Sequence, residues 1–203
     1  MVAKTILHPT VVNESDIIPT GPERLFTVED LLEISCRDEN RYELVRGKLY
    51  IMPPAGAPHG DYAMSIGARM RIFAEDHNLG KVFAAETGFI LEHNPDLVRA
   101  PDAGFVQAER IPAEGVPAGF FPGQPDLALE IISPNDRASD VQDKVQEWLS
   151  HGTLLVWVVE PKTKTIMIYR QDGSAQLLHS GDLLTGEDVI PGFEFYVSRL
   201  FDD

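Results

Sequence analysis

The sequence predicts an α/β fold in which a central mixed β-sheet is flanked by helices. The first observation is an apolar strand, an amphipathic helix and a second apolar strand within residues 127–159. Such a crossover joins parallel strands. The second is a pair of hairpin patterns, at residues 41–52 and 165–179, which require antiparallel pairing. The third is a helical apolar stripe within residues 60–78.

The N-terminal segment differs in composition from the rest of the chain. Residues 1–24 are punctuated by proline and glycine at positions 9, 19, 21 and 22 and show little periodicity. We interpret them as an arm that packs on the domain or on a partner subunit, and residues 25–203 as a single domain. Residues 27–35 predict a short helix, with Thr27 as its N-cap and acidic residues in its first turn.

A hairpin and a longer helix come next. Arg41–Val45 and Lys48–Met52 read as strands around a turn at Arg46-Gly47. The helix predicted at Gly60–Asn78 should end at Gly80. Its apolar stripe consists of Tyr62, Ile66, Met70 and Phe73.

Short strands and a long loop lead to the crossover. The strands are expected at residues 81–84, 87–91, 98–100 and 104–107, and the loop at 111–125 is rich in proline and glycine. In the crossover, Ser139 and Gln142 have the spacing of a capping box that begins the helix. The last hairpin pairs residues 165–169 with 175–179 around Asp172-Gly173.

Composition limits the classes of function. The 203 residues carry a formal charge of −15, which argues against a broad nucleic-acid surface, because such surfaces are basic. A small local basic groove remains compatible with that charge. Cys36 is the single cysteine, so no intrachain disulfide forms and a cytoplasmic setting is the simplest expectation. No apolar run approaches the roughly 18 residues of a membrane span.

Glu130 is the most unusual residue of the predicted core. It lies within the apolar strand Leu127–Ile132, where an unpaired carboxylate costs several kcal/mol. Alternation puts Glu130 on the face opposite Leu127, Leu129 and Ile131. On the following helix, Lys144 falls in one column with Val141 and Trp148. Lys144 is about 7.5 Å along the helix and Glu130 about 10 Å back along the strand, so the two should meet.

Asp102 is a second candidate acid. Pro101 precedes it and Gly104 follows, which suggests a bent strand that aims the side chain. Two carboxylates on neighbouring strands and a lysine are typical of a Mg²⁺ site that acts on a phosphodiester. In such a site the acids hold the cation, and the lysine stabilises charge or orients the attacking water.

Several short motifs occur in the order of a known family. Together they resemble the Uma-two type of restriction-endonuclease-like proteins, within the PD-(D/E)xK nuclease superfamily, over about residues 26–170. The motifs are Tyr42-Glu-Leu-Val-Arg-Gly-Lys48, Pro58-His-Gly60, Ala85-Glu-Thr-Gly88, Ala100-Pro-Asp102, Pro125–Pro134 and Asp143-Lys144. The resemblance implies a restriction-endonuclease-like fold, Mg²⁺ or Mn²⁺ as cofactor, a nucleic-acid substrate that the net charge does not support, and a homodimer.

The resemblance also implies roles for particular residues. Asp102 and Glu130 match the two motif acids that bind metal, and Glu43 matches an additional acid. The superfamily lysine normally follows the second acid by two residues, where this chain has Ile132. Lys144 is then the migrated lysine of the site.

Other candidates have a structural alternative. Glu43 could instead pair across the sheet with Lys48 or another basic residue. His59 could contact phosphate or carry a proton, or could be a surface or capping residue. Glu86 and Asp126 are candidates for support around the site.

Two further readings stay open. Phe120 and Phe121 could stack on bases or anchor their loop. The whole chain could be a catalytically inactive binding or regulatory module that acts as a dimer, a reading that Ile132 and the acidic charge favour.

Overall fold

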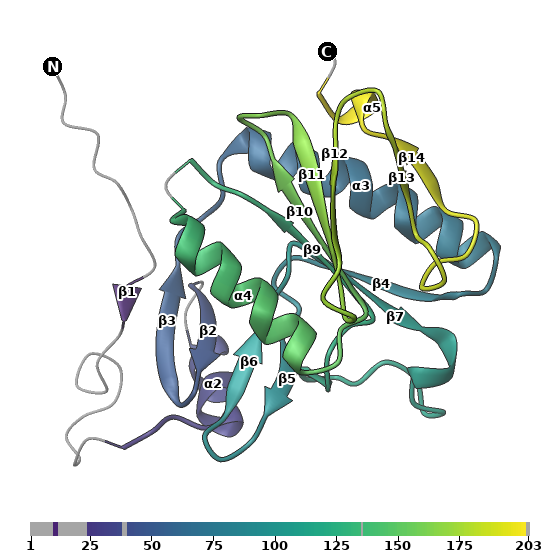
Figure 1. Ribbon diagram of the computed structural model, residues 1–203. Coiled ribbons are helices and arrows are strands. Elements are labelled where there is room, and N and C mark those ends of the chain that lie inside the picture. The colour runs from purple at the N-terminus through teal and green to yellow at the C-terminus, as the bar shows by residue number, and fades with distance from the viewer. Residues whose placement is uncertain (1–9, 12–23, 38–39, 135, 202–203) are drawn as a thin grey trace, which may run out of the picture.

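The computed structural model describes residues 10–11, 24–37, 40–134 and 136–201, so the predicted arm at 1–24 lies almost entirely outside the described residues. The predicted α/β class is confirmed. The strands do not form one sheet, however: they divide between two six-stranded sheets and a two-stranded ribbon (Figure 1).

The core sheet is mixed, as expected. Its strand order is β12-β11-β10-β9-β7-β4. Only β9 and β10 run parallel within it, with Glu130 opposite Val158, and α4 (Ala138–Ser150) makes the crossover between them. The strands are β4 (Gly80–Ala84), β7 (Ala103–Gln107), β9 (Leu127–Ile131), β10 (Leu155–Glu160), β11 (Thr165–Arg170) and β12 (Ala175–Leu178).

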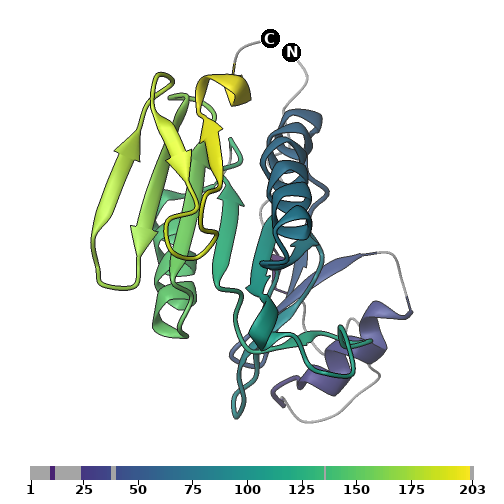
Figure 2. The same cartoon turned by 90° about the vertical axis from the view of Figure 1, so that its right-hand side faces the viewer.

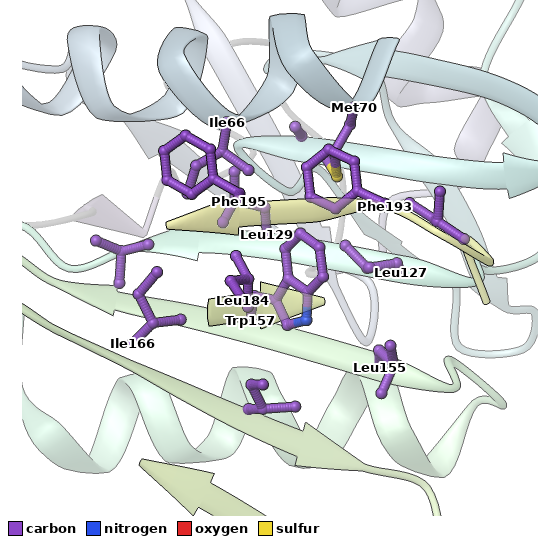
Figure 3. Close-up of a cluster of buried hydrophobic side chains, with 14 of the residues drawn as sticks. Ile66, Met70, Leu127, Leu129, Leu155, Trp157, Ile166, Leu184, Phe193 and Phe195 are labelled. Atoms are coloured by element: carbon purple, nitrogen blue, oxygen red, sulfur yellow. The ribbon is translucent and has the colours of Figure 1, made fainter. Parts of the chain in front are cut away.

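Helices α3 (Ala57–Asp76) and α4 cover opposite faces of the core sheet (Figure 2). Leu127, Leu129 and Ile131 of β9 face α3, where Ile66 and Met70 join a core that includes Trp157, Phe193 and Phe195 (Figure 3). Ala128 faces α4, with Val145, Trp148, Val156 and Val158. The alternation of β9 therefore points Glu130 toward α4.

The second sheet, here called the N-terminal sheet, has the order β1-β3-β2-β6-β5-β8. Helix α2 (Val28–Ser35) packs against it, and Thr27 is its N-cap, as predicted. The N–H of Asp30 donates to the Thr27 hydroxyl, and the N–H of Thr27 donates to the Asp30 carboxylate. At the β2–β3 turn, Arg46 and Gly47 both take positive φ, the geometry of a tight hairpin. The strands are β1 (Thr10–Val11), β2 (Arg41–Val45), β3 (Lys48–Met52), β5 (Phe89–Glu92), β6 (Leu97–Arg99) and β8 (Phe121–Pro122).

The C-terminal elements close the α3 side. They are β13 (Leu183–Thr185), β14 (Glu194–Tyr196) and the short helix α5 (Ser198–Phe201), and a 3₁₀ turn, η1, spans Ala108–Arg110. Tyr62 of α3 packs on Phe201, and Phe73 of α3 packs on Phe193. No helix in the described part of the chain is both long and apolar enough to cross a membrane.

Residues 100–102 carry the chain from one sheet to the other. Strand β6 of the N-terminal sheet ends at Arg99, and β7 of the core sheet begins at Ala103. The N–H of Asp102 donates to the carbonyl of Leu129 at 2.9 Å. The bend predicted from Pro101 is thus a crossing between sheets, which leaves Asp102 beside β9.

Two predicted helix boundaries are wrong. Helix α3 ends at Asp76, and Asn78 at φ 54 adopts the left-handed conformation that follows the helix, because asparagine also tolerates that region; Gly80 already belongs to β4. Helix α4 begins at Ala138 after Arg137 without a side-chain cap, and the hydroxyl of Ser139 bonds to Asp140 instead.

Candidate functional site

Glu130 and Lys144 meet as the sequence predicts. The Lys144 Nζ lies 2.9 Å from Glu130 Oε2. The indole N–H of Trp148, one helical turn after Lys144, donates to Glu130 Oε1 at 2.8 Å. Both carboxylate oxygens of Glu130 therefore have a donor from α4, which explains why the carboxylate is tolerated between β7 and β10.

Glu43 joins the same lysine from the N-terminal sheet. Its Oε1 lies 3.4 Å from Lys144 Nζ, which also donates to the carbonyl of Ala100 at 3.3 Å. Its Oε2 lies 2.7 Å from a guanidinium nitrogen of Arg99. Of the alternative partners, Lys48 is wrong, because it lies opposite Val45 in the hairpin. The base that Glu43 contacts on a neighbouring strand is Arg99 of β6.

Arg99 extends the network to α4. Its guanidinium contacts Glu43 and, at 2.5 Å, Glu147. The N-terminal sheet is thereby tied to the helix that covers the core sheet. Four segments far apart in sequence supply the cluster: β2, β6 with the crossing that follows it, β9 and α4.

Asp102 and His59 form the other side of the site. The backbone N–H of Ile131 donates to Asp102 Oδ2 at 2.7 Å, and His59 Nε2 lies 3.3 Å from the same oxygen. His59 stands near the start of α3, which begins at Ala57. The structure therefore brings His59 to a predicted motif acid.

Burial and neighbouring charges shift the pKa values in opposite directions. Burial raises the pKa of Glu130 to about 7, since the attraction of Lys144 offsets burial only in part and the charge of Asp102 adds to it. Burial also opposes the ionised form of Glu43, but Lys144 and Arg99 outweigh it and lower the pKa of Glu43 to about 2. The hydrogen bond to Asp102 raises the pKa of His59.

The lysine is held in its charged form. Burial disfavours the ammonium, yet the carboxylates of Glu130 and Glu43 outweigh burial, so the pKa of Lys144 lies above its ordinary value. The described cluster contains more acids than cations. Its carboxylates are Glu43, Asp102, Glu130 and Glu147, and its permanent cations are Arg99 and Lys144.

The two other predicted accessory acids have different positions. Asp126 stands four residues before Glu130 in the sequence, about 13 Å away at ~3.3 Å per residue, so it lies away from the cluster. It binds Arg110 at 2.8 Å and the N–H of Gln107 at 2.8 Å. Glu86 is exposed, lies 3.7 Å from Arg41 and lines a cleft whose wall includes Glu43 and Arg99.

Sequence reasoning missed Arg99, Glu147 and the bond from Trp148. Trp148 could have been found, since it shares the helical column of Lys144 and a buried indole N–H needs an acceptor. Arg99 and Glu147 gave no local signal, because their contacts span 48 and 56 residues.

A cleft opens beside the cluster. It has a volume of about 320 Å³, and the site residues Glu43, Arg99 and Ala100 form one wall. Arg41, Tyr42 and Phe120 are among the residues of the remaining walls. Phe121 is buried in the same apolar cluster as Trp148 and anchors the loop, whereas Phe120 is only partly buried, against the apolar cluster of the N-terminal sheet.

Comparison with known proteins agrees with this geometry. The model of the Uma2 family, described as "Putative restriction endonuclease", matches residues 28–198. The chain belongs to the Uma2 family. The resemblance predicted from the ordered motifs is thus confirmed.

A solved structure has the same fold as this chain. It is described as "a putative nuclease belonging to DUF820" from Anabaena variabilis ATCC 29413. The match has a TM-score of 0.76 at 21% identity and covers 87% of this chain and 97% of the other. The two proteins share a fold. Among curated proteins, the comparison finds no match.

The donor set of this Uma2 chain suits a hard divalent cation. Within residues 24–37, 40–134 and 136–201, no three His, Cys, Asp or Glu side chains are grouped to hold a metal. Mg²⁺ usually takes only one or two protein carboxylates and keeps its waters. Asp102 and Glu130 lie close enough for the charge of Asp102 to raise the pKa of Glu130. A cation would relieve that repulsion.

Proposed function

We propose that this Uma2 protein is a Mg²⁺- or Mn²⁺-dependent nuclease that hydrolyses phosphodiester bonds in nucleic acid. The observation that carries the proposal is the buried contact between Lys144 and Glu130, beside Asp102 and Glu43. It unites four residues from separate parts of the chain in a family described as "Putative restriction endonuclease". A structural core would bury apolar side chains at these positions at lower cost.

Asp102 and Glu130 are the proposed metal ligands. The bound cation would supply Lewis-acid stabilisation of the phosphate and a water of lowered pKa. Asp102 keeps its carboxylate oriented through the N–H of Ile131. Glu130 would hold the cation through its two carboxylate oxygens, which accept hydrogen bonds from Lys144 and Trp148 in this structure.

Lys144 is the proposed electrostatic residue. Its ammonium is held by Glu130, Glu43 and the carbonyl of Ala100, so it is oriented before substrate arrives. Release of one of these acceptors leaves an N–H that donates to a phosphate oxygen or to the attacking water. Glu43 acts through Lys144 and, being bonded to Arg99, keeps the lysine in place.

His59 is the proposed proton carrier. Its ring nitrogen lies against Asp102 Oδ2, at the edge of the metal site. A histidine near this position can accept a proton from water or give one to a leaving oxygen.

A second candidate function is a catalytically inactive binding module that assembles as a homodimer. It is favoured by the hydrogen bond that each Glu130 oxygen already accepts, and by the apolar Ile132 where the superfamily has lysine. Light scattering would determine the oligomeric state. A monomer would refute the dimer in either function.

The decisive experiment is cleavage of single- and double-stranded DNA and RNA with Mg²⁺, Mn²⁺ or a chelator. Glu130→Gln and Asp102→Asn should each lower the rate by about 10²–10³-fold, the usual cost of losing one stabilising group. Asp126→Asn is the matched control, since it removes a buried carboxylate that directly precedes the same strand and lies away from the site. Equal rates for the wild type and Glu130→Gln on every substrate would refute the nuclease.

Metal binding has its own measurement. A ligand that binds only the folded state at 100 times its Kd stabilises that state by about 2.7 kcal/mol. Thermal unfolding with added Mn²⁺ should therefore show stabilisation of the wild type, and much less for Asp102→Asn. Equal stabilisation of both proteins would place the metal elsewhere.

A further inference from the structure

The cleft beside the cluster is a separate feature from the metal site. Glu43 and Ala100 both contact Lys144 and both line the cleft, so its inner wall is the cluster itself. Asp102 and Glu130 do not line it. A ligand in the cleft would therefore lie next to the reacting groups without replacing them.

An aromatic ring forms the outer wall. Phe120 is half-buried and lines both this cleft and a second hollow of about 370 Å³. Gly88 underlies the ring: a Cβ added there would lie 2.6 Å from Phe120 Cδ1. The absence of a side chain at Gly88 therefore leaves room for the ring of Phe120 between the two hollows. A planar group such as a base can stack on that ring.

The cleft also holds a cation with unused hydrogen-bonding capacity. The Nε of Arg41 is buried and has no hydrogen-bond partner among the described residues. The carboxylate of Glu86 lies 3.7 Å from this Nε, beyond hydrogen-bond distance. Arg99 by contrast is neutralised by two carboxylates. Arg41 is therefore the cation of the cleft that is poised for a phosphate.

The volume of the cleft and the burial of the acids beside it favour a single-stranded over a double-stranded nucleic acid. The carboxylate of Glu130 belongs to a residue that is only 9% exposed, and Glu43 is 3% exposed, so a duplex lying on the surface cannot reach them. A volume of about 320 Å³ is at the lower end of ligand sites, roughly 300–1,000 Å³, and fits one nucleotide rather than two strands. The charge of −15 further disfavours broad contact with a duplex.

We propose that the cleft takes one unpaired nucleotide of a single-stranded nucleic acid, with its base stacked on Phe120 and its phosphate held by Arg41. The neighbouring phosphodiester then reaches the cluster at Lys144. This inference rests on the proposed nuclease function and adds the substrate class to it.

The test is binding, measured in a chelator so that no cleavage occurs. Fluorescence anisotropy compares labelled single-stranded oligo-dT and oligo-U with a duplex of the same length. Loss of one base–aromatic stack costs about 1–3 kcal/mol, so Phe120→Ala should weaken single-strand binding by about 5- to 150-fold. Tyr196→Ala, which removes an exposed aromatic side chain on β14, is the matched control and should bind like wild type.

Two further variants guard against a folding defect. Phe120→Leu keeps an apolar side chain without the π-face and should weaken binding nearly as much as the alanine variant. Arg41→Gln should reduce the slope of log K against log salt by about 0.7, the value for one phosphate contact in a single strand. Thermal unfolding of each variant confirms that it is folded.

The outcomes separate this inference from the proposed function. Single-strand binding that depends on Phe120, without metal-dependent cleavage of any substrate, would sustain the cleft and refute the nuclease. Cleavage with unchanged binding by Phe120→Ala would refute the cleft alone. Equal affinity for strand and duplex, or no binding of either, would also overturn the inference.

Discussion

The substitution Lys144→Met tests the electrostatic design of the site most directly. Methionine retains much of the aliphatic stem and removes the ammonium that lies 2.9 Å from Glu130 and 3.4 Å from Glu43. Glu43 keeps Arg99 and Glu130 keeps Trp148. The variant therefore leaves one buried carboxylate, that of Glu130, without a cationic partner.

The expected loss follows from that burial. Removing one partner of a buried ion pair costs about 3–5 kcal/mol. The side chain of Lys144 is 21% exposed, so water partly screens the ion pair. We therefore expect a loss at the lower end of this range, about 3 kcal/mol. In a domain of this size about 1 kcal/mol corresponds to 2–4 °C in Tm, which gives a decrease of roughly 6–12 °C.

The assay is urea and thermal unfolding of Lys144→Met and of Lys144→Met/Glu130→Gln. The double variant should recover most of the loss, since the unpaired charge is gone.

The pH dependence of the single variant has a definite sign. An acid whose folded pKa lies above its unfolded value destabilises the folded state above the folded pKa, and this cost disappears below the unfolded pKa. Glu130 already has a pKa of about 7 against an ordinary 4.5, and loss of Lys144 raises it further. The defect of Lys144→Met should therefore be large at pH 8 and small at pH 5.

Two results would refute this reasoning. A loss below about 1 kcal/mol at pH 8 would mean that the pair behaves as an exposed one. A double variant no more stable than the single one would mean that Lys144 acts through packing and not through Glu130.

Two further predictions concern single hydrogen bonds. Trp148→Phe removes the donor to Glu130 Oε1 and should cost about 1–3 kcal/mol of unfolding free energy in urea, whereas an unchanged midpoint would show that the bond is replaceable. Asp96→Asn weakens the cap on Val28 N–H at 2.7 Å and should destabilise α2 by about 1 kcal/mol. Burial opposes ionisation of Asp96, but the bonds from Val28 and Asn94 outweigh it and lower its pKa. The contribution of Asp96 is thus present above pH ~4 and lost as pH falls below it, so the wild type and Asp96→Asn should converge in acid; a constant difference would contradict this assignment.

Local sequence patterns predicted the wrong helix ends where more than one neighbouring residue could end or cap the helix. Gly80 was expected to end α3, but Asn78 adopts the left-handed conformation and Gly80 opens β4. Ser139 matched a capping box, yet Arg137 occupies the N-cap position. Helix ends differ little in free energy between adjacent residues, so packing elsewhere decides them.

The sequence by itself determined the hairpins, the parallel crossover and the meeting of Glu130 with Lys144. Those features depend on fixed quantities: the alternation of a strand, the column of a helix and the rise per residue of each. Fourteen residues separate the pair, and one crossover places both.

Only the tertiary structure decided the rest of the site. The contacts of Glu43 with Arg99, of Arg99 with Glu147 and of His59 with Asp102 each join segments more than 40 residues apart. They exist because residues 100–102 pass from one sheet to the other and bring β2 and β6 of the N-terminal sheet against α4. The relative packing of two sheets follows from the sum of many apolar contacts, and no local spacing in the sequence encodes it.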